Sequence, residues 1–173
     1  APAGAHVVAA SAVAVAYTRS HPVPGPGGST RAGVAIVGCL TGTPRPVQLG
    51  TAAAVERAAL NGTTLAYATP EPRGIDTIAT TIVVASISRG RVLFTVPAGR
   101  IAIAPSAVSV DALVVTPGGT LAWIQHGGTA ESLGYSVHAA SVAKPADHQL
   151  AASPAIQPGS LELAAGTVTW EQG

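Results

Sequence analysis

The sequence predicts an all-β fold, and three observations lead to this class. The chain is 47% hydrophobic but only 10% charged, and Ala, Val, Thr, Gly and Pro dominate it, whereas the residues that build amphipathic helices are scarce. Short β-branched or alternating runs lie between Gly- and Pro-rich turns, which indicates antiparallel strands. Segments that end in an aromatic residue also recur along the chain. The 173 residues suffice for one domain, 1–173, with its own core.

The recurring aromatic residue defines a repeat. Tyr17, Tyr67, Trp123 and Trp170 each end an apolar segment, and they follow one another at intervals of 50, 56 and 47 residues. Such a period indicates a repeated supersecondary unit that buries its faces by stacking on its neighbours. We therefore expect these rings to fill the core between sheets rather than to stack on a ligand.

The first unit is predicted over residues 6–50. The segment Val13–Tyr17, at the end of an alternating apolar run that begins at Val7, is the second strand of the unit. We expect His21–Gly33 to be a loop, because Pro22, Pro24 and Pro26 cannot donate ladder hydrogen bonds. The remaining elements are a strand at Val34–Val37, a turn at Thr41–Pro44 and a short strand at Val47–Leu49.

The same order of elements returns in the units 51–104 and 105–154, and the segment 155–173 supplies a half-unit. In the second unit the loop is Pro70–Ile78, the strands are Thr81–Ile87 and Val92–Val96, and the turn is Ser88–Gly90. In the third unit the strands are Ser109–Val115, Tyr135–Ala139 and His148–Leu150, the loop is Gly127–Gly134, and the turn is Lys144–Asp147. Each whole unit is thus predicted to be four short antiparallel strands.

Three segments show a resemblance to a known family. They are Thr116–Trp123, the Thr41-Gly42 turn with Val47–Leu49, and Ser160–Trp170. These resemble the blades of TolB-like and other exported actinobacterial β-propellers, although Asn61 and Gly118 stand where the family has an acidic turn residue. The resemblance implies stacked blades, about 3.5 of them in this chain, whereas a closed ring needs at least about four. Three alternatives would explain the incomplete ring: the chain is a fragment of a longer propeller, two chains complete one another, or the fold is a smaller β-sandwich.

Composition disfavours several classes of partner, and the start of the chain suggests export. The net charge is +1 without a Lys/Arg cluster, which disfavours nucleic acid, and no apolar run reaches the length of a transmembrane segment. The opening Ala1-Pro2-Ala3 suggests a processed chain, so we expect a secreted, periplasmic or cell-surface bacterial protein. The single cysteine, Cys39, precludes an intramolecular disulfide and is expected to be buried or to pair between chains. Ile36–Cys39 also resembles a lipobox, but the basic start and uninterrupted apolar run of a signal peptide are missing.

No motif for catalysis, a metal or a cofactor stands out. The five histidines form no pair at ligand spacing, and the eight acidic residues are scattered, so the sequence predicts neither a metal site nor an acid/base pair. Gly134–His138 resembles a nucleophile elbow around Ser136, but His138 replaces the final glycine and no helix pattern follows. A hydrolase that uses Ser136 is therefore an alternative only.

The sequence predicts a non-catalytic, exported β-propeller-like scaffold or binding module for protein or small-ligand contacts. The loops between the second and third strands of the units should emerge on one rim, and binding residues are expected there. The candidates are His21, Arg31, Arg73, Asp76, His126 and Glu131. An assembly subunit that pairs through open sheet edges into a homo-oligomer is the other alternative.

Overall fold

The computed structural model of the chain describes residues 2, 4–25, 28–43, 45–72, 77–102, 108–127 and 134–173. Within these residues the protein is all-β, which confirms the predicted class, and its strands form three four-stranded antiparallel sheets and one two-stranded sheet. The described part of the chain contains no helix that is both long enough and apolar enough to cross a bilayer.

Each four-stranded sheet is a meander in which consecutive strands are neighbours. The first sheet contains β1 (His6–Ala10), β2 (Ala14–Pro24), β3 (Thr30–Leu40) and β4 (Val47–Ala52). The second contains β5 (Arg57–Asn61), β6 (Thr64–Pro72), β7 (Thr77–Ser86) and β8 (Arg91–Ala102), and the third contains β9 (Ser109–Val115), β10 (Leu121–Gly127), β11 (Gly134–Ser141) and β12 (Lys144–Ser153). A 3-10 turn, η2 (Pro158–Ser160), precedes the last sheet, β13 (Glu162–Ala164) and β14 (Thr167–Thr169). The sheets span residues 6–52, 57–102, 109–153 and 162–169. The corresponding predicted units are 6–50, 51–104, 105–154 and 155–173.

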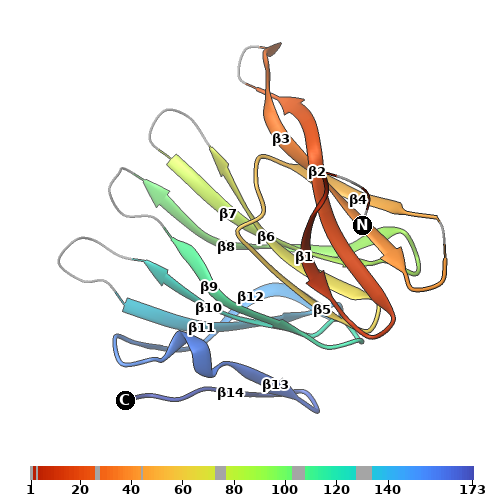
Figure 1. Ribbon diagram of the computed structural model, residues 1–173. Coiled ribbons are helices and arrows are strands. Elements are labelled where there is room, and N and C mark those ends of the chain that lie inside the picture. The colour runs from red at the N-terminus through yellow and green to blue at the C-terminus, as the bar shows by residue number, and fades with distance from the viewer. Residues whose placement is uncertain are drawn as a thin grey trace.

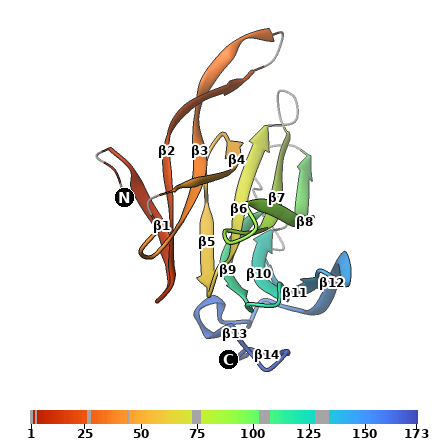
Figure 2. The ribbon, with the colours of Figure 1, turned by 90° about the vertical axis from the view of Figure 1, so that its right-hand side faces the viewer.

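The four sheets stack in chain order, as Figure 1 shows from β1–β4 at the upper right to β13–β14 at the bottom. Their first strands follow one another along one side of the stack, because β1 contacts β5, β5 contacts β9, and β9 contacts β13. Figure 2 shows β5 between β1 and β9 from the side. An apolar cluster fills each of the three interfaces between sheets. In chain order, these clusters include Ile36 and Leu65, then Ile82 and Trp123, then Ile124 and Leu161.

Three of the four repeat aromatics pack against the preceding sheet. Tyr67 lies in the cluster between the first and second sheets, Trp123 in the next and Trp170 in the last. Burial raises the pKa of the Tyr67 hydroxyl to about 12, and a Cβ atom on Gly50 would lie 2.8 Å from its oxygen, so the first sheet needs glycine there. Tyr17 packs on Ala35 and Val37, on the face of the first sheet that has no preceding sheet. The prediction that these rings fill the core between sheets is confirmed for Tyr67 and Trp123, whereas Trp170 is only half-buried and Tyr17 lies on the outer face of the first sheet.

The prediction of a loop at His21–Gly33 is wrong over most of its length. β2 continues to Pro24 and pairs with β3 in unbroken register, so that Pro22 lies opposite Ala32 and Pro24 opposite Thr30. On its other edge β2 pairs with β1 only as far as Thr18, which lies opposite His6. Beyond Thr18 this edge of β2 has no partner strand among the described residues. Prolines at alternate positions of a strand direct their nitrogens, which carry no hydrogen, to the same edge. The strand tolerates them when that edge has no partner strand, because no backbone donor is needed there.

Other predicted loops and turns are shorter in the structure. β6 runs to Pro72 and β7 starts at Thr77, so strand structure extends into the predicted loop Pro70–Ile78. The predicted turn Lys144–Asp147 is wrong, because the turn lies at 142–143 and Lys144 already opens β12. Between the pairs Ala139–His148 and Ser141–Lys144 the register shifts, because β12 has more residues there than β11. Pro145 and Asp147 are among these additional residues of β12. The Asn61-Gly62 segment forms the predicted tight turn, with Gly62 at φ 58°.

Candidate functional site

The predicted binding residues are not brought together among the described residues. His21 and Arg31 are half-buried on the β2–β3 hairpin, and His126 lies near the end of β10. No hydrogen bond or ion pair joins these three side chains, and the buried Nε of Arg31 has no partner in the described structure. Arg73, Asp76 and Glu131 lie outside the described residues. In Figure 1 the ends of β6 and β10 point to the same side of the molecule, and the β2–β3 hairpin rises above them.

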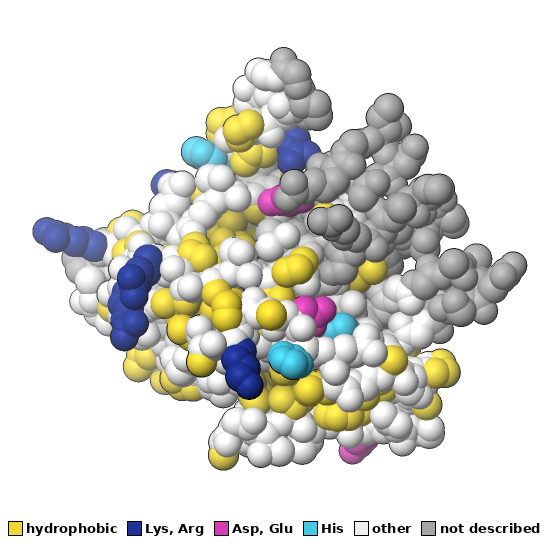
Figure 3. Space-filling model, turned by 180° about the vertical axis from the view of Figure 1, so that it is seen from behind, with side chains coloured by type: hydrophobic (Ala, Val, Ile, Leu, Met, Phe, Trp, Pro, Cys, Tyr) yellow, Lys and Arg dark blue, Asp and Glu magenta, His cyan; other side chains and the backbone are white. Residues whose placement is uncertain are grey.

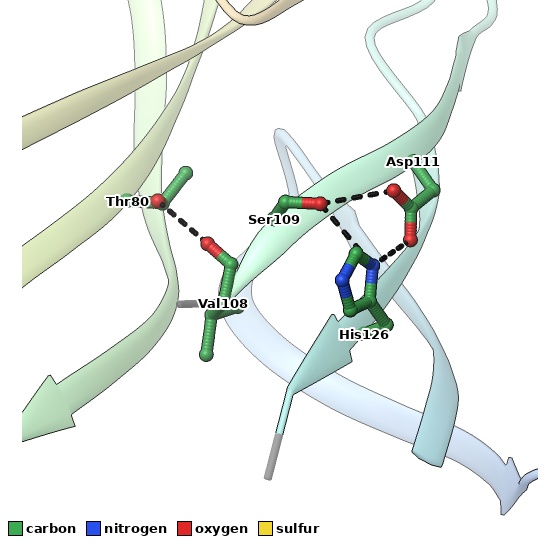
Figure 4. Close-up of polar contacts among 5 residues, drawn as sticks. All are labelled: Thr80, Val108, Ser109, Asp111 and His126. Carbon is green, nitrogen blue, oxygen red and sulfur yellow. Dashed lines mark hydrogen bonds and ion pairs between the residues drawn. The ribbon is translucent and has the colours of Figure 1, made fainter. Parts of the chain in front are cut away.

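His126 belongs to a polar group with Ser109 and Asp111, which Figure 4 shows in detail. The Ser109 hydroxyl donates to Asp111 Oδ1 over 2.9 Å and lies 3.2 Å from His126 Nδ1, and the same nitrogen bonds Asp111 Oδ2. Ser109 and His126 are direct cross-strand partners, and Asp111 is the unpaired residue of β9 at the register shift next to Gln125. Thr80 of β7 donates to the Val108 carbonyl and ties the second sheet to this end of β9.

A second carboxyl group, that of Glu56, faces this group from the connection between the first and second sheets. Partial desolvation raises the pKa of Glu56, and the charge of Asp111 adds to this shift. A hydrogen bond from the Val110 backbone and the charges of Arg57 and His126 oppose it. The acids and histidines are scattered along the sequence, but the fold places Glu56 of the second unit near Asp111 and His126 of the third.

A second Ser–His–Asp group lies on β11 and β12. His138 Nδ1 lies 2.7 Å from Asp147 Oδ1, and His138 Nε2 lies 2.8 Å from the Ser136 hydroxyl. The His138 ring stacks on Trp123 with a centroid separation of 5.1 Å and an interplanar angle of 14°. His138 is only 4% exposed, whereas Ser136 is half-buried.

The local sequence explains this geometry. Ser136 and His138 are two residues apart on a strand, so their side chains share one face of the sheet. Register irregularities flank His138, and Asp147 lies in the extra residues of β12 that these irregularities accommodate. Bulged strands re-aim side chains in this way. The Ser-x-His spacing in the nucleophile-elbow-like segment was the available signal, but the sequence did not identify Asp147 as its partner.

The described surface also contains a polar pocket of about 370 Å³ between the second and third sheets. Arg89 and Arg91 line it together with the hydroxyl groups of Thr63, Ser86 and Ser88. These hydroxyls bond one another, with 3.1 Å between Thr63 and Ser88 and 3.1 Å between Ser86 and Ser88. In Figure 3 the Lys and Arg side chains lie mainly toward the left of the face, while acidic and His side chains lie nearer its middle.

No group of three or more His, Cys, Asp or Glu side chains in the described ranges could hold a metal ion. Cys39 is half-buried, and its thiol contacts the Thr43 carbonyl oxygen at 3.3 Å.

Comparison of the chain with protein-family models, curated proteins and solved structures found no match.

Proposed function

We propose that the chain is an exported, β-propeller-like scaffold that binds a protein or a small ligand. One observation supports this proposal above the others: Tyr67, Trp123 and Trp170 pack in the same way on successive sheets whose first strands are adjacent. Repetition of one interface along a stack is the property of blade-like architectures, which present loops and turns along their rims for contact with partners.

The pocket between the second and third sheets is the binding surface with the clearest chemistry. Arg89 and Arg91 are exposed, and neither makes an ion pair with an acid in the described part of the chain. Guanidinium groups bind carboxylates and phosphates in a bidentate manner, and neighbouring hydroxyls add donors. The ligand class that this surface fits is an anionic group, such as a phosphate or a carboxylate of a partner. The predicted residues His21, Arg31 and His126 remain separate candidates, since His21 and Arg31 lie on the β2–β3 hairpin and His126 lies on β10.

The test is calorimetric titration of the chain with tripolyphosphate and with a poly-glutamate peptide at low salt. The proposal predicts binding that falls at least tenfold in the Arg89→Gln/Arg91→Gln double variant and weakens with added salt. Arg57→Gln removes an exposed arginine elsewhere and is the matched control. Equal affinity of the double variant and the control, or no binding to the wild type, would contradict this assignment of the surface.

The assembly alternative is favoured by the outer face of the first sheet. Tyr17 packs there without a preceding sheet, and the neighbouring strand β1 and its turn expose Val7 and Val13, which are 47% and 48% exposed. A second copy that covers this face would occupy the position of the missing sheet. Light scattering over a concentration series tests this alternative: a discrete oligomer that Val7→Asp dissociates supports it, and a monomer at millimolar concentration counts against it.

A further inference from the structure

The hydrogen bonds of His138 fix which of its ring nitrogens carries the proton. An ionised Asp147 carboxylate can only accept, so the 2.7 Å contact requires a proton on His138 Nδ1. In the neutral ring Nε2 then presents its lone pair, and the Ser136 hydroxyl at 2.8 Å is the donor to it. A serine whose hydroxyl donates to an imidazole that a carboxylate orients is the arrangement of an activated nucleophile.

Packing holds the base in this orientation. Trp123 is fully buried between the second and third sheets, and its indole stacks on the His138 ring. The imidazole is also almost fully buried, so its hydrogen bonds compete little with bulk water. The ring therefore cannot rotate freely away from Ser136, which is the preorganisation that a general base requires.

A side-chain amide lies on the strand next to Ser136. Gln125 lies directly opposite Ser136 in the β10–β11 register. The Trp123 indole N–H, which can only donate, bonds Gln125 Oε1 over 3.0 Å and so fixes the identity of the two amide atoms. The Gln125 NH₂ group makes no other hydrogen bond in the described structure, and a side-chain amide is a suitable oxyanion donor.

The Ser136 position is accessible from solvent. Ser136 lines an open pocket of about 360 Å³ together with Gly127, Gly134, Tyr135 and Gln149. This volume lies near the lower end of the range for small-molecule sites, roughly 300–1,000 Å³.

We propose that Ser136 is the nucleophile of an acyl-transfer site that hydrolyses short-chain carboxylic esters. In the first step Ser136 Oγ bonds the ester carbonyl carbon while His138 Nε2 takes the hydroxyl proton. The bond between the carbonyl carbon and the alkoxy oxygen then breaks, and His138 returns that proton to the leaving alcohol. Water, the second substrate, repeats the sequence on the acyl-serine and releases the carboxylic acid. Asp147 is a positioning residue that holds the Nδ1–H tautomer of His138.

A fluorophosphonate probe tests the nucleophile directly, because an activated serine forms an Oγ–P bond as fluoride leaves. The proposal predicts one adduct on the wild-type chain, located at Ser136 by peptide mass mapping. Ser136→Ala abolishes the adduct, and His138→Gln slows its formation by about 10²–10⁴-fold. The matched control is Ser109→Ala, which removes the serine of the other Ser–His–Asp group and leaves labelling unchanged.

Turnover of p-nitrophenyl acetate separates positioning from folding. Asp147→Asn lowers kcat with little change in KM, and Asp147→Glu restores part of the rate. The proposal is overturned by a wild-type chain that forms no adduct at Ser136, by equal labelling of Ser109, or by ester turnover that survives in Ser136→Ala. Mapping of the wild-type adduct needs no variant, so a variant that fails to fold leaves the test decisive.

Discussion

The third sheet holds two groups of the same composition, Ser109–Asp111–His126 and Ser136–His138–Asp147, in different environments. In the second group the imidazole lies between its partners and uses one nitrogen for each. In the first, serine and carboxylate approach the same nitrogen, Nδ1, and also bond one another. The His138 side chain is 5% exposed, whereas the His126 side chain is 36% exposed. The comparison teaches that residue composition alone does not create a nucleophile, because only the bridging imidazole can relay a proton from serine.

Burial separates the groups as clearly as connectivity does. The His138 group is anchored in the core through Trp123. The His126 ring meets Tyr135 edge to face at a centroid distance of 5.7 Å. Substitutions in the Ser136–His138–Asp147 group should therefore affect stability and chemistry together, and those in the Ser109–Asp111–His126 group should affect mainly local electrostatics.

The largest expected effect is that of Trp123→Ala. This change removes a fully buried indole from the interface of the second and third sheets, and it should lower the free energy of unfolding by about 3–5 kcal/mol. Tyr135→Ala, on the half-buried side chain that faces His126, should cost less than half as much. Urea denaturation of both variants measures the difference. Equal losses would show that the two groups are equally embedded in the core.

A smaller difference should separate the two histidines themselves. His138→Ala removes an almost fully buried ring and leaves the half-buried Ser136 hydroxyl and the Asp147 carboxylate without their shared partner, and we expect a loss of about 1–3 kcal/mol. His126→Ala acts at a more exposed ion pair, where losses stay within about 1 kcal/mol. Thermal unfolding at pH 7 is the measurement, and a larger loss for His126→Ala would reverse the order that the contacts imply.

The smallest expected effect is that of Glu56→Gln, and its sign depends on pH. Because the pKa of Glu56 is raised in the folded state above its ordinary 4.5, the folded state favours the protonated carboxyl. The resulting stability is fully present below the unfolded pKa and is lost as pH rises through the folded pKa. We expect Glu56→Gln to match the wild type in urea midpoint at pH 3 and to exceed it slightly at pH 8. A variant that is less stable than the wild type at pH 8 would contradict the raised pKa.

Much of the fold was predictable from local sequence signals. β-branched runs such as Thr81–Ile87, the Asn61-Gly62 turn and the recurring aromatics correspond to β7, to a hairpin turn and to core residues. The prolines at 22 and 24 were misleading, because their effect depends on whether a strand edge is open, and that is a tertiary property.

The candidate site was less predictable. Ser136 and His138 were visible as neighbours in the sequence, but Asp147 joins them only through the irregular β11–β12 register. Asp111 and His126 are 15 residues apart and meet because β9 and β10 pair. Glu56 comes from another unit and reaches them only through sheet stacking. Contacts that depend on strand register or on the stacking of sheets leave no periodic pattern in a single sequence.

The most direct test of the account is the tautomer of His138, observed by long-range ¹H–¹⁵N correlation spectra of the ring nitrogens at pH 8. We expect a neutral ring protonated at Nδ1, with a slowly exchanging proton, and an unprotonated Nε2 that accepts from Ser136. In Asp147→Asn this preference should be lost. A His138 ring protonated at Nε2 in the wild type, or one that exchanges its proton freely with solvent, would contradict both the relay and the distinction between the two groups.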